Sequence, residues 1–169
     1  MLREIGFDQA FTYAYSRREQ TYAGLFYKDD VPEHVKAARL SEVIDTFQAV
    51  AAERNRAIET GRLHVVLVEG VAKKSKADQV LWTGRTDTNK RVVFSDCRVL
   101  GSLTRETASR LRYAEASDID GILSAVSESI QPGAYVVVKV ISVKGHTLRG
   151  RALAKTTIRQ ACDLRLYSL

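Results

Sequence analysis

Hydrophobic positions follow a helical period before Gly61 and a strand-like period after it. Within residues 30–60, apolar side chains recur every three or four positions, as on one face of a helix. These positions are Leu40, Val43, Ile44, Phe47, Val50 and Ala51. Asp30, Pro32 and Glu33 have the order of a capping box with an early proline, and Gly61 stands where a left-handed cap ends a helix. The pattern predicts one long helix over residues 30–60.

Residues 5–17 alternate more loosely. Phe7, Phe11, Tyr13 and Tyr15 fall on one parity, and aromatic residues at alternate positions favour a β-strand. No partner strand follows nearby in the sequence. We therefore expect this strand to pair with another segment.

Five short runs after Gly61 have the composition of strands. They cover residues 62–70, 80–85, 91–95, 135–143 and 147–154, and turn-forming stretches such as AKKSKAD, TDTNK and KGH separate several of them. A five-stranded sheet left open exposes an edge, so we expect it to close. The fold class is predicted as α+β, with a five-stranded antiparallel β-barrel of the oligonucleotide-binding type.

Two segments fall outside this barrel. Residues 101–132 are rich in Ser, Thr, Asp and Glu and interrupt the strands, which indicates an insertion loop with a short helix over residues 119–130. Residues 156–169 are predicted to be a tail. The predicted organisation is therefore residues 1–60, the barrel over residues 61–155 with its insertion, and the tail.

The distribution of charge says more about function than the overall composition does. Apolar residues make up 45% of the chain, as in an ordinary globular protein. The net charge is +6, and its excess lies in residues 61–96, at +3, and residues 133–169, at +6. Two basic blocks, the second of which extends into the predicted tail, indicate a polyanionic partner, with nucleic acid the first candidate.

The basic residues lie on turns and strand ends of the predicted barrel. A small barrel fills its interior with side chains, so its ligands bind on the outer strand face and on the loops. Cations there contact a phosphate backbone and supply affinity with little sequence choice. The candidate RNA-binding residues are Lys73, Lys74, Ser75, Lys76, Trp82, Arg85, Asn89, Lys90, Arg91, Arg149, Arg151 and Lys155.

Trp82 has two interpretations. It is either a stacking platform for an unpaired base or a core residue. The parity of residues 80–83 does not decide which side of the strand it occupies, so both interpretations stay open.

Other classes of site are not indicated. Cys97 and Cys162 are isolated, and the three histidines are scattered, so no metal-ligand spacing and no nucleophile–base constellation is present. No run of about 18 apolar residues suggests a membrane span. Glu4 and Asp8 make the first residues a poor transit peptide, so we expect a targeting segment to be absent or to lie outside this stretch.

Five stretches resemble the C-terminal part of radical-SAM tRNA methylthiotransferases. They are AYSRREQT (14–21), KDDVPEHVKAARL (28–40), LVEGVAKKS (67–75), GRTDTNKRVVF (84–94) and HTLRGRAL (146–153). The resemblance is to the tRNA-2-methylthio-N6-dimethylallyladenosine synthase type, and to its eukaryotic organellar branch. It covers nearly the whole chain apart from residues 101–132 and the last few residues.

The resemblance implies a role for each part. Residues 1–60 would be the last strand and final helix of the catalytic barrel, and residues 61–155 a TRAM domain that holds the tRNA anticodon stem-loop. Tyr15, Ser16, Arg17 and Arg18 would lie near substrate, although an ion pair with Glu19 or Asp29 is the alternative for the two arginines. Mitochondrial localisation is also implied, with the cytoplasm as the alternative.

The resemblance further implies chemistry that this stretch does not contain. The family adds a methylthio group to C2 of an isopentenylated adenosine beside the anticodon, using two [4Fe–4S] clusters and S-adenosylmethionine. The radical cluster needs a C-x3-C-x2-C loop, which is absent from this sequence. We therefore expect no cofactor, no metal and no catalytic residue in this stretch, and no activity from it alone.

Two further hypotheses remain open. The chain is alternatively a protein-interaction module that contacts a partner through its acidic helix and residues 101–132. It is also compatible with a stand-alone nucleic-acid-binding barrel without a preference for tRNA.

Overall fold

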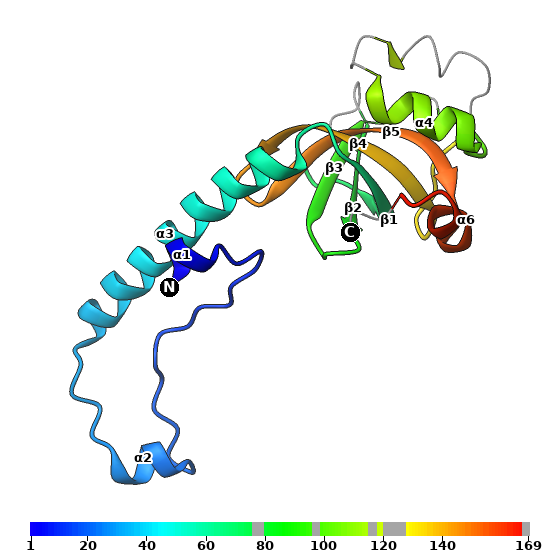
Figure 1. Cartoon of the computed structure of the whole chain (residues 1–169). Coiled ribbons are helices and arrows are strands. Elements are labelled where there is room, and N and C mark those ends of the chain that lie inside the picture. The colour runs from blue at the N-terminus through cyan, green and yellow to red at the C-terminus, as the bar shows by residue number, and fades with distance from the viewer. Residues whose placement is uncertain (76–79, 96–98, 115–117, 120–127, 167–169) are drawn as a thin grey trace. The chain divides into compact units, whose positions relative to one another are not determined.

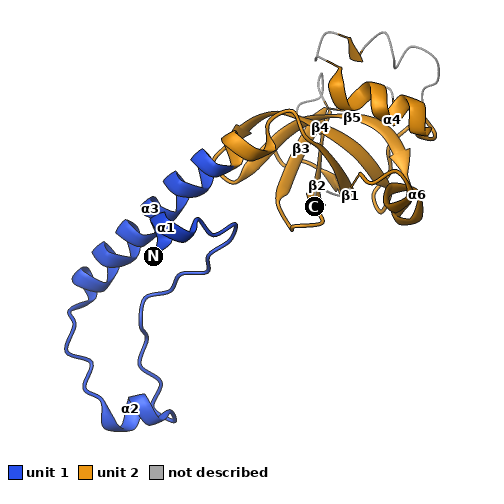
Figure 2. Cartoon of the chain, viewed as in Figure 1, with its two compact units in different colours: residues 1–54 blue, residues 55–169 orange. Residues whose placement is uncertain are grey.

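The computed structural model describes residues 1–75, 80–95, 99–114, 118–119 and 128–166. The chain divides into two compact units, Met1–Arg54 and Asn55–Leu169 (Figure 2). Its elements alternate from helices to strands and back, as Figure 1 shows by colour, so the predicted α+β class is confirmed. None of the described helices is long and apolar enough to cross a lipid bilayer.

The first unit contains helices and extended chain. Two short helices, α1 (Leu2–Ile5) and α2 (Tyr22–Phe26), precede the long helix α3 (Glu33–Glu59), which ends in the second unit. The long helix was predicted over residues 30–60, and Gly61 after it has the expected positive φ of 83°. The helix begins at Glu33, three residues after the predicted cap Asp30, and the Glu33 carboxylate accepts a hydrogen bond from Lys36. The carbonyl of Pro32 accepts the amides of Val35 and Lys36 at the helix start.

The strand predicted over residues 5–17 is wrong. α1 ends at Ile5, and the following residues up to Ser16 belong to no helix or strand. A strand exists only with a hydrogen-bonded neighbour, and no described strand lies within residues 1–54. Alternating aromatic residues therefore do not form a strand in this unit.

The second unit is built on five strands, β1 (Leu63–Val71), β2 (Leu81–Thr86), β3 (Arg91–Ser95), β4 (Tyr135–Lys144) and β5 (Thr147–Thr156). Each strand lies within two residues of its predicted bounds. The sheet has the order β1-β2-β3-β5-β4, and β4 returns to β1, so the sheet closes on itself (Figure 1).

The prediction of a wholly antiparallel sheet is wrong at one place. β3 and β5 pair in parallel, with Val93 opposite Arg149, whereas the other four pairs are antiparallel. A ring of five strands cannot alternate in direction all the way round, because five is odd. Closing the ring therefore requires at least one parallel pair.

Two hydrophobic clusters lie on opposite sides of this sheet. One contains Val66 and Val138 with residues of β3 and β5, so it fills the interior. The other contains Val65 and Val137 with residues of two helices, Arg105–Tyr113 and Ile158–Asp163, so it lies on the outer surface beneath them. Because β4 is covered on both sides, its residues 136–140 are all buried.

Gly150 permits the close approach of β4 and β5. A Cβ atom at this position would lie 2.5 Å from Val138 Cγ1 and 2.6 Å from the Lys139 carbonyl oxygen. Both distances are too short for non-bonded carbon. A side chain at this position would push the two strands apart, so glycine is required by packing.

Two helices occur where loops were predicted. α4 (Arg105–Tyr113) lies in the predicted insertion, and α6 (Ile158–Asp163) lies in the predicted tail. In each helix a threonine just before the first residue, Thr104 or Thr157, accepts a backbone amide through its side chain. The short helix predicted over residues 119–130 falls mostly on residues 120–127, outside the described part of the chain.

Candidate nucleic-acid interface

Strand pairing places four arginines on one outer face of the closed sheet. Arg85 on β2 lies opposite Arg91 on β3. On β5, Arg149 lies opposite Val93 and Arg151 lies opposite Ser95. Paired residues point to the same side of a sheet, and the residues between them, such as Val92 and Leu148, are buried. We call Arg85, Arg91, Arg149 and Arg151 the arginine face.

Local contacts orient two members of the arginine face. The Arg91 Nε donates to Thr83 Oγ1 at 3.2 Å, on the neighbouring strand. The Arg85 Nη1 donates to the Asn89 carbonyl at 3.1 Å, and its Nε lies 3.5 Å from the Glu69 carboxylate. Glu69 therefore partly neutralises the charge of Arg85.

The turn between β1 and β2 adds two exposed lysines, Lys73 and Lys74. Ser75 in the same turn has a structural role, since its hydroxyl oxygen accepts the amide of Leu81 at 3.0 Å. Lys76, the next predicted contact, lies outside the described residues. Asn89 occupies a left-handed turn position, with φ of 60°.

Lys90 is not part of the arginine face, although Arg91 beside it is. Its side chain is buried, and its ammonium lies 2.5 Å from Glu59 Oε1. Glu59 also contacts His64 Nε2, at 2.7 Å. Hydrogen bonds from His64 and Lys90 outweigh the effect of burial and lower the pKa of the Glu59 carboxyl to about 2.

Lys155 and Trp82 also lie apart from the arginine face. The Lys155 ammonium contacts Glu128 at 2.9 Å, beyond the three buried residues 152–154. Trp82 is half-buried and packs against the interior cluster. Its indole Nε1 is buried and has no hydrogen-bond partner in the described part of the chain. The structure therefore favours the core-packing interpretation of Trp82.

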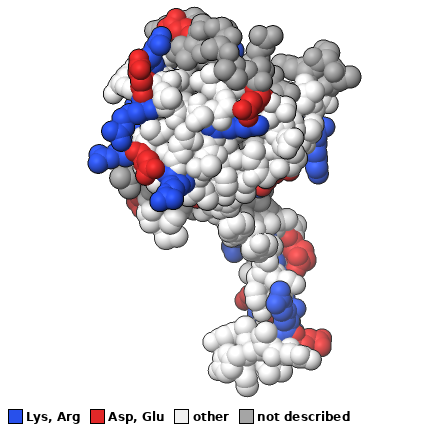
Figure 3. Space-filling model, turned by 90° about the vertical axis from the view of Figure 1, so that its right-hand side faces the viewer, with Lys and Arg blue, Asp and Glu red and all other residues white. Residues whose placement is uncertain are grey.

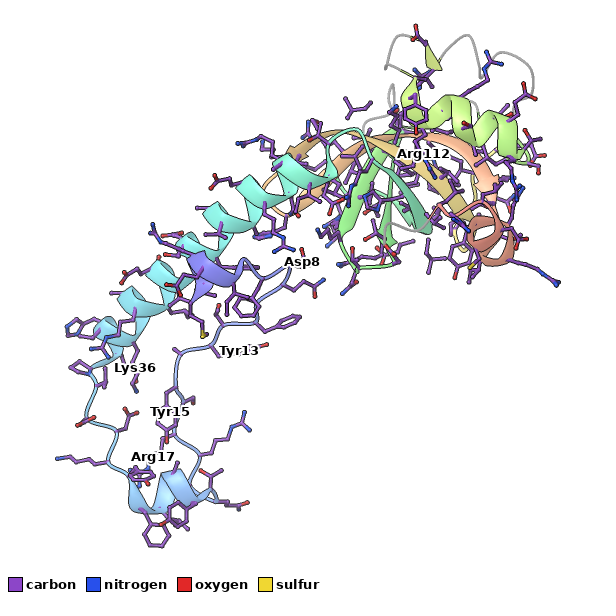
Figure 4. All side chains as sticks on the ribbon, in the orientation of Figure 1. Asp8, Tyr13, Tyr15, Arg17, Lys36 and Arg112 are labelled. Atoms are coloured by element: carbon purple, nitrogen blue, oxygen red, sulfur yellow. The ribbon has the colours of Figure 1, made fainter. Side chains whose placement is uncertain are left out.

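The predicted substrate-proximal residues lie in the first unit, where Figure 4 labels Tyr15, Arg17 and Lys36. The Arg17 guanidinium donates two hydrogen bonds to the Gly24 carbonyl, at 3.0 and 2.7 Å, so it holds α2 against the preceding chain. The Arg18 side chain is exposed, as is Ser16. Neither arginine forms the predicted ion pair with Glu19 or Asp29 among the described contacts.

Asp29 forms an ion pair with Lys36. This contact joins the segment before α3 to the helix. The Lys36 ammonium lies 2.5 Å from Asp29 and 2.9 Å from Glu33. Hydrogen bonding to Asp29, and then to Glu33, raises the pKa of the Lys36 ammonium. The same ammonium lies 5.7 Å from the centre of the Tyr15 ring. Tyr15 and Lys36 line a hollow of about 660 Å³ within this unit.

Sequence reasoning missed the roles of Glu59 and His64. Glu59 was not singled out from the sequence, and His64 was one of three histidines described as scattered. Their separation of only five residues, with Gly61 between them, is the one feature of the sequence that could have predicted their contact. Lys90 is 31 residues from Glu59, and nothing in the sequence predicts that contact.

The geometry of the described residues indicates no metal site. Within the described ranges, no three His, Cys, Asp or Glu side chains gather closely enough to bind an ion. Cys162 is exposed, and Cys97 lies outside these ranges. The donors present do not fit an iron–sulfur cluster, which needs several thiolates together.

On the face that Figure 3 shows, positive charge lies in small groups. On the face shown in Figure 3, Lys and Arg side chains lie beside Asp and Glu side chains and form no continuous positive surface. The fold and the arginine face together define a basic α+β domain on a closed five-stranded sheet.

Comparison with known proteins relates this domain to a family of enzymes. No family model matches the chain. The chain is 37% identical over 161 residues to the mitochondrial tRNA methylthiotransferase CDK5RAP1 of Homo sapiens, covering 95% of this chain and 23% of that protein. It is 46% identical over 94 residues to the tRNA-2-methylthio-N(6)-dimethylallyladenosine synthase of Phocaeicola vulgatus, covering 56% of this chain and 20% of that protein.

A CDK5RAP1-like protein of Oryza sativa is 39% identical over 99 residues, which cover 59% of this chain and 16% of that protein. The chain spans less than a quarter of the length of these relatives. It is homologous, over 95% of its own length, to the C-terminal portion of the tRNA methylthiotransferases.

Proposed function

We propose that this chain is the RNA-binding C-terminal part of a tRNA methylthiotransferase. The closed sheet acts as an OB-like barrel of the TRAM type and holds the anticodon stem-loop of a tRNA. The observation that carries this proposal is the arginine face, which gathers four guanidinium groups on three adjacent strands. The homology to proteins named for their action on tRNA supports it.

Arginine suits this role for a physical reason. Its planar guanidinium donates two parallel hydrogen bonds to a phosphate and keeps its charge at all relevant pH values. Contacts of this kind fix the position of an RNA without reading its bases. An enzyme that modifies one nucleotide beside the anticodon needs such positioning for the rest of the arm.

The chemistry itself belongs outside this stretch. The family resemblance implies addition of a methylthio group to C2 of isopentenyladenosine, with two iron–sulfur clusters and S-adenosylmethionine. The described residues do not fit a cluster, so we assign this chain no step of the reaction. Its contribution is to bind and orient the RNA. We extend the proposal to the mitochondrion, because three relatives that cover 95% of the chain are named mitochondrial.

The test is the affinity of the 169-residue chain for a synthetic anticodon stem-loop, measured by fluorescence anisotropy over a range of salt concentrations. The test variant combines Arg91→Gln, Arg149→Gln and Arg151→Gln. The control combines Arg56→Gln, Arg62→Gln and Arg159→Gln, three exposed positions off the arginine face with the same change in charge.

We expect the test variant to bind at least ten times more weakly. The slope of log affinity against log salt should fall by about 2, because about 0.7 counterion is released for each phosphate contact to a single strand. Equal affinities for the test variant and the control would exclude this interface. An unrelated single strand that competes as well as the stem-loop would instead indicate nucleic-acid binding without a tRNA preference.

A further inference from the structure

A groove of about 330 Å³ lies between α4 and α6, on elements that carry none of the arginine face. Its lining contains Arg105 and Arg112 from α4, and Arg165 from the chain just after α6. Arg105 and Arg112 are seven residues apart, which is close to two helical turns, so they lie on the same side of α4. All three arginines are exposed.

A specific contact joins the two walls of this groove. The Arg112 Nη2 donates to the carbonyl oxygen of Arg165 at 3.2 Å. Arg112 is labelled in Figure 4, where its side chain extends from α4. Arg165 has a left-handed backbone, with φ of 50°, which is uncommon for a residue with a side chain. The contact and the turn hold the two walls together.

The charge of the groove is not balanced. Its lining holds three arginines and one carboxylate, that of Asp163. Across the described residues, no carboxylate forms an ion pair with Arg105, Arg112 or Arg165. Three cations that share a groove repel one another, and an anion placed among them removes that repulsion.

We infer that this groove binds a phosphate group of the RNA backbone, as a second contact separate from the arginine face. The inference rests on the proposed function and names a further part of the same interface. The planar guanidinium of arginine matches the geometry of a phosphate, which accepts hydrogen bonds on several oxygens. Tyr113, with 81% of its surface exposed, lies beside them and offers a ring on which an unpaired base stacks.

An acidic protein segment fits the groove less well. Apart from the exposed ring of Tyr113, the apolar part of the lining consists of Ala108 and Leu164. The centre of a protein interface normally contains large apolar or aromatic anchors that become fully buried. A groove with three arginines, one carboxylate and a single exposed aromatic ring favours a highly charged backbone with an unpaired base as its occupant.

The test compares two double variants of the 169-residue chain in the same anisotropy experiment. The groove variant combines Arg105→Gln and Arg165→Gln, which leaves the Arg112 side chain and the Arg165 carbonyl in place. The control combines Arg110→Gln and Arg159→Gln, two exposed arginines on the same helices that do not line the groove. Thermal melting shows whether both variants remain folded.

We expect the groove variant to bind the stem-loop about ten times more weakly than the control, with a salt slope lower by between one and two. If the groove variant binds as the control does while the arginine-face variant loses affinity, the groove inference fails and the proposed function stands. If neither the groove variant nor the arginine-face variant loses affinity, the groove inference and the proposed function both fail. A groove variant that loses binding to a poly-glutamate peptide but keeps its RNA affinity overturns the inference in favour of a protein partner.

An Arg112→Lys variant separates phosphate recognition from charge alone. Lysine keeps the charge but lacks the paired donors of arginine. We expect this variant to bind the stem-loop several times more weakly than the wild type, with an unchanged salt slope. Wild-type affinity in a folded Arg112→Lys chain contradicts a geometric role for Arg112.

Discussion

At the scale of single residues, neighbours in the sequence have opposite roles. Lys90 is buried against Glu59, whereas Arg91 is exposed on the arginine face. Both are cations of a single basic stretch, and the sequence offers no means to separate them. Strand alternation and the position of α3 decide which one is available to a phosphate.

Glu59 joins the end of α3 to two parts of the closed sheet. It contacts His64 on β1 and Lys90 beside β3, and all three side chains are buried. A buried carboxylate is stable only when it is paired and hydrogen-bonded, and this one has both partners. Removal of its charge takes away the carboxylate that the buried Lys90 ammonium contacts at 2.5 Å.

We therefore expect Glu59→Gln to destabilise the chain by about 3 kcal/mol, measured by urea unfolding. The matched control is Glu53→Gln, an exposed glutamate on the same helix, which should change the free energy of unfolding by less than about 0.5 kcal/mol. Equal effects of the two substitutions would show that the buried network contributes nothing specific.

The same network predicts a pH dependence. The pKa of the Glu59 carboxyl is about 2 in the folded chain, against an ordinary value of 4.5. The folded state binds the proton of Glu59 less tightly than the unfolded state does. The stabilisation that the ionised Glu59 carboxylate supplies is therefore complete above pH 4.5 and is lost as the pH falls towards 2. Unfolding free energies measured across this range should fall by roughly 3 kcal/mol more for the wild type than for Glu59→Gln. Parallel curves would contradict the prediction.

At the scale of elements, Lys139 connects α4 to the sheet through hydrogen bonds. The ammonium of Lys139 on β4 donates to the carbonyls of Leu111, at 3.1 Å, and Arg112, at 3.5 Å, and also to that of Ala114. These carbonyls are at the C-terminal end of α4, where the last groups have no partner within the helix. Burial lowers the pKa of this ammonium, and the helix end, which carries partial negative charge, is a suitable place for it.

Lys139→Met keeps the length of the side chain but removes its donors. We expect it to lower the stability by about 2 kcal/mol, because it leaves buried carbonyls without a partner. Hydrogen exchange should become faster at the amides of α4. Lys144→Met, at an exposed position on the same strand, is the control. Unchanged exchange in α4 would show that hydrophobic packing alone holds the helix.

The sequence predicted some elements better than others for identifiable reasons. The five strands and α3 were predicted within a few residues, because their apolar periods are long and end at turn residues. α4 and α6 were missed, although Thr104 and Thr157 have the chemistry of helix starts. Both helices are short, and the packing of Leu111 and Ala161 against the outer side of the sheet stabilises them.

At the scale of the whole molecule, the two units differ in how they bury apolar surface. The second unit has two continuous hydrophobic clusters. The first exposes several large aromatic side chains, among them Phe11 at 80% and Tyr13 at 84%. An exposed group of this kind normally lies against another polypeptide.

We expect the isolated chain to self-associate through these residues. Phe11→Ser combined with Tyr13→Ser should raise the dissociation constant of self-association at least tenfold in sedimentation velocity. The free energy of association falls by about 2 kcal/mol for each aromatic side chain that is no longer buried in the interface. Ile158→Ser, at a position 51% exposed in the second unit, is the control. A chain that stays monomeric at all concentrations would contradict this expectation.

The sequence by itself determined the long helix, the five strands and the family likeness, because these depend on local period and on residues close together in the chain. Tertiary structure alone decided the parallel pairing of β3 with β5, since an odd ring requires it. It also decided that Arg91, Arg149 and Arg151 share a face, whereas the Lys90 side chain is buried against Glu59 and Trp82 packs, half-buried, against the interior cluster. Contacts between strands far apart in the sequence depend on the closed sheet, and no local pattern specifies them.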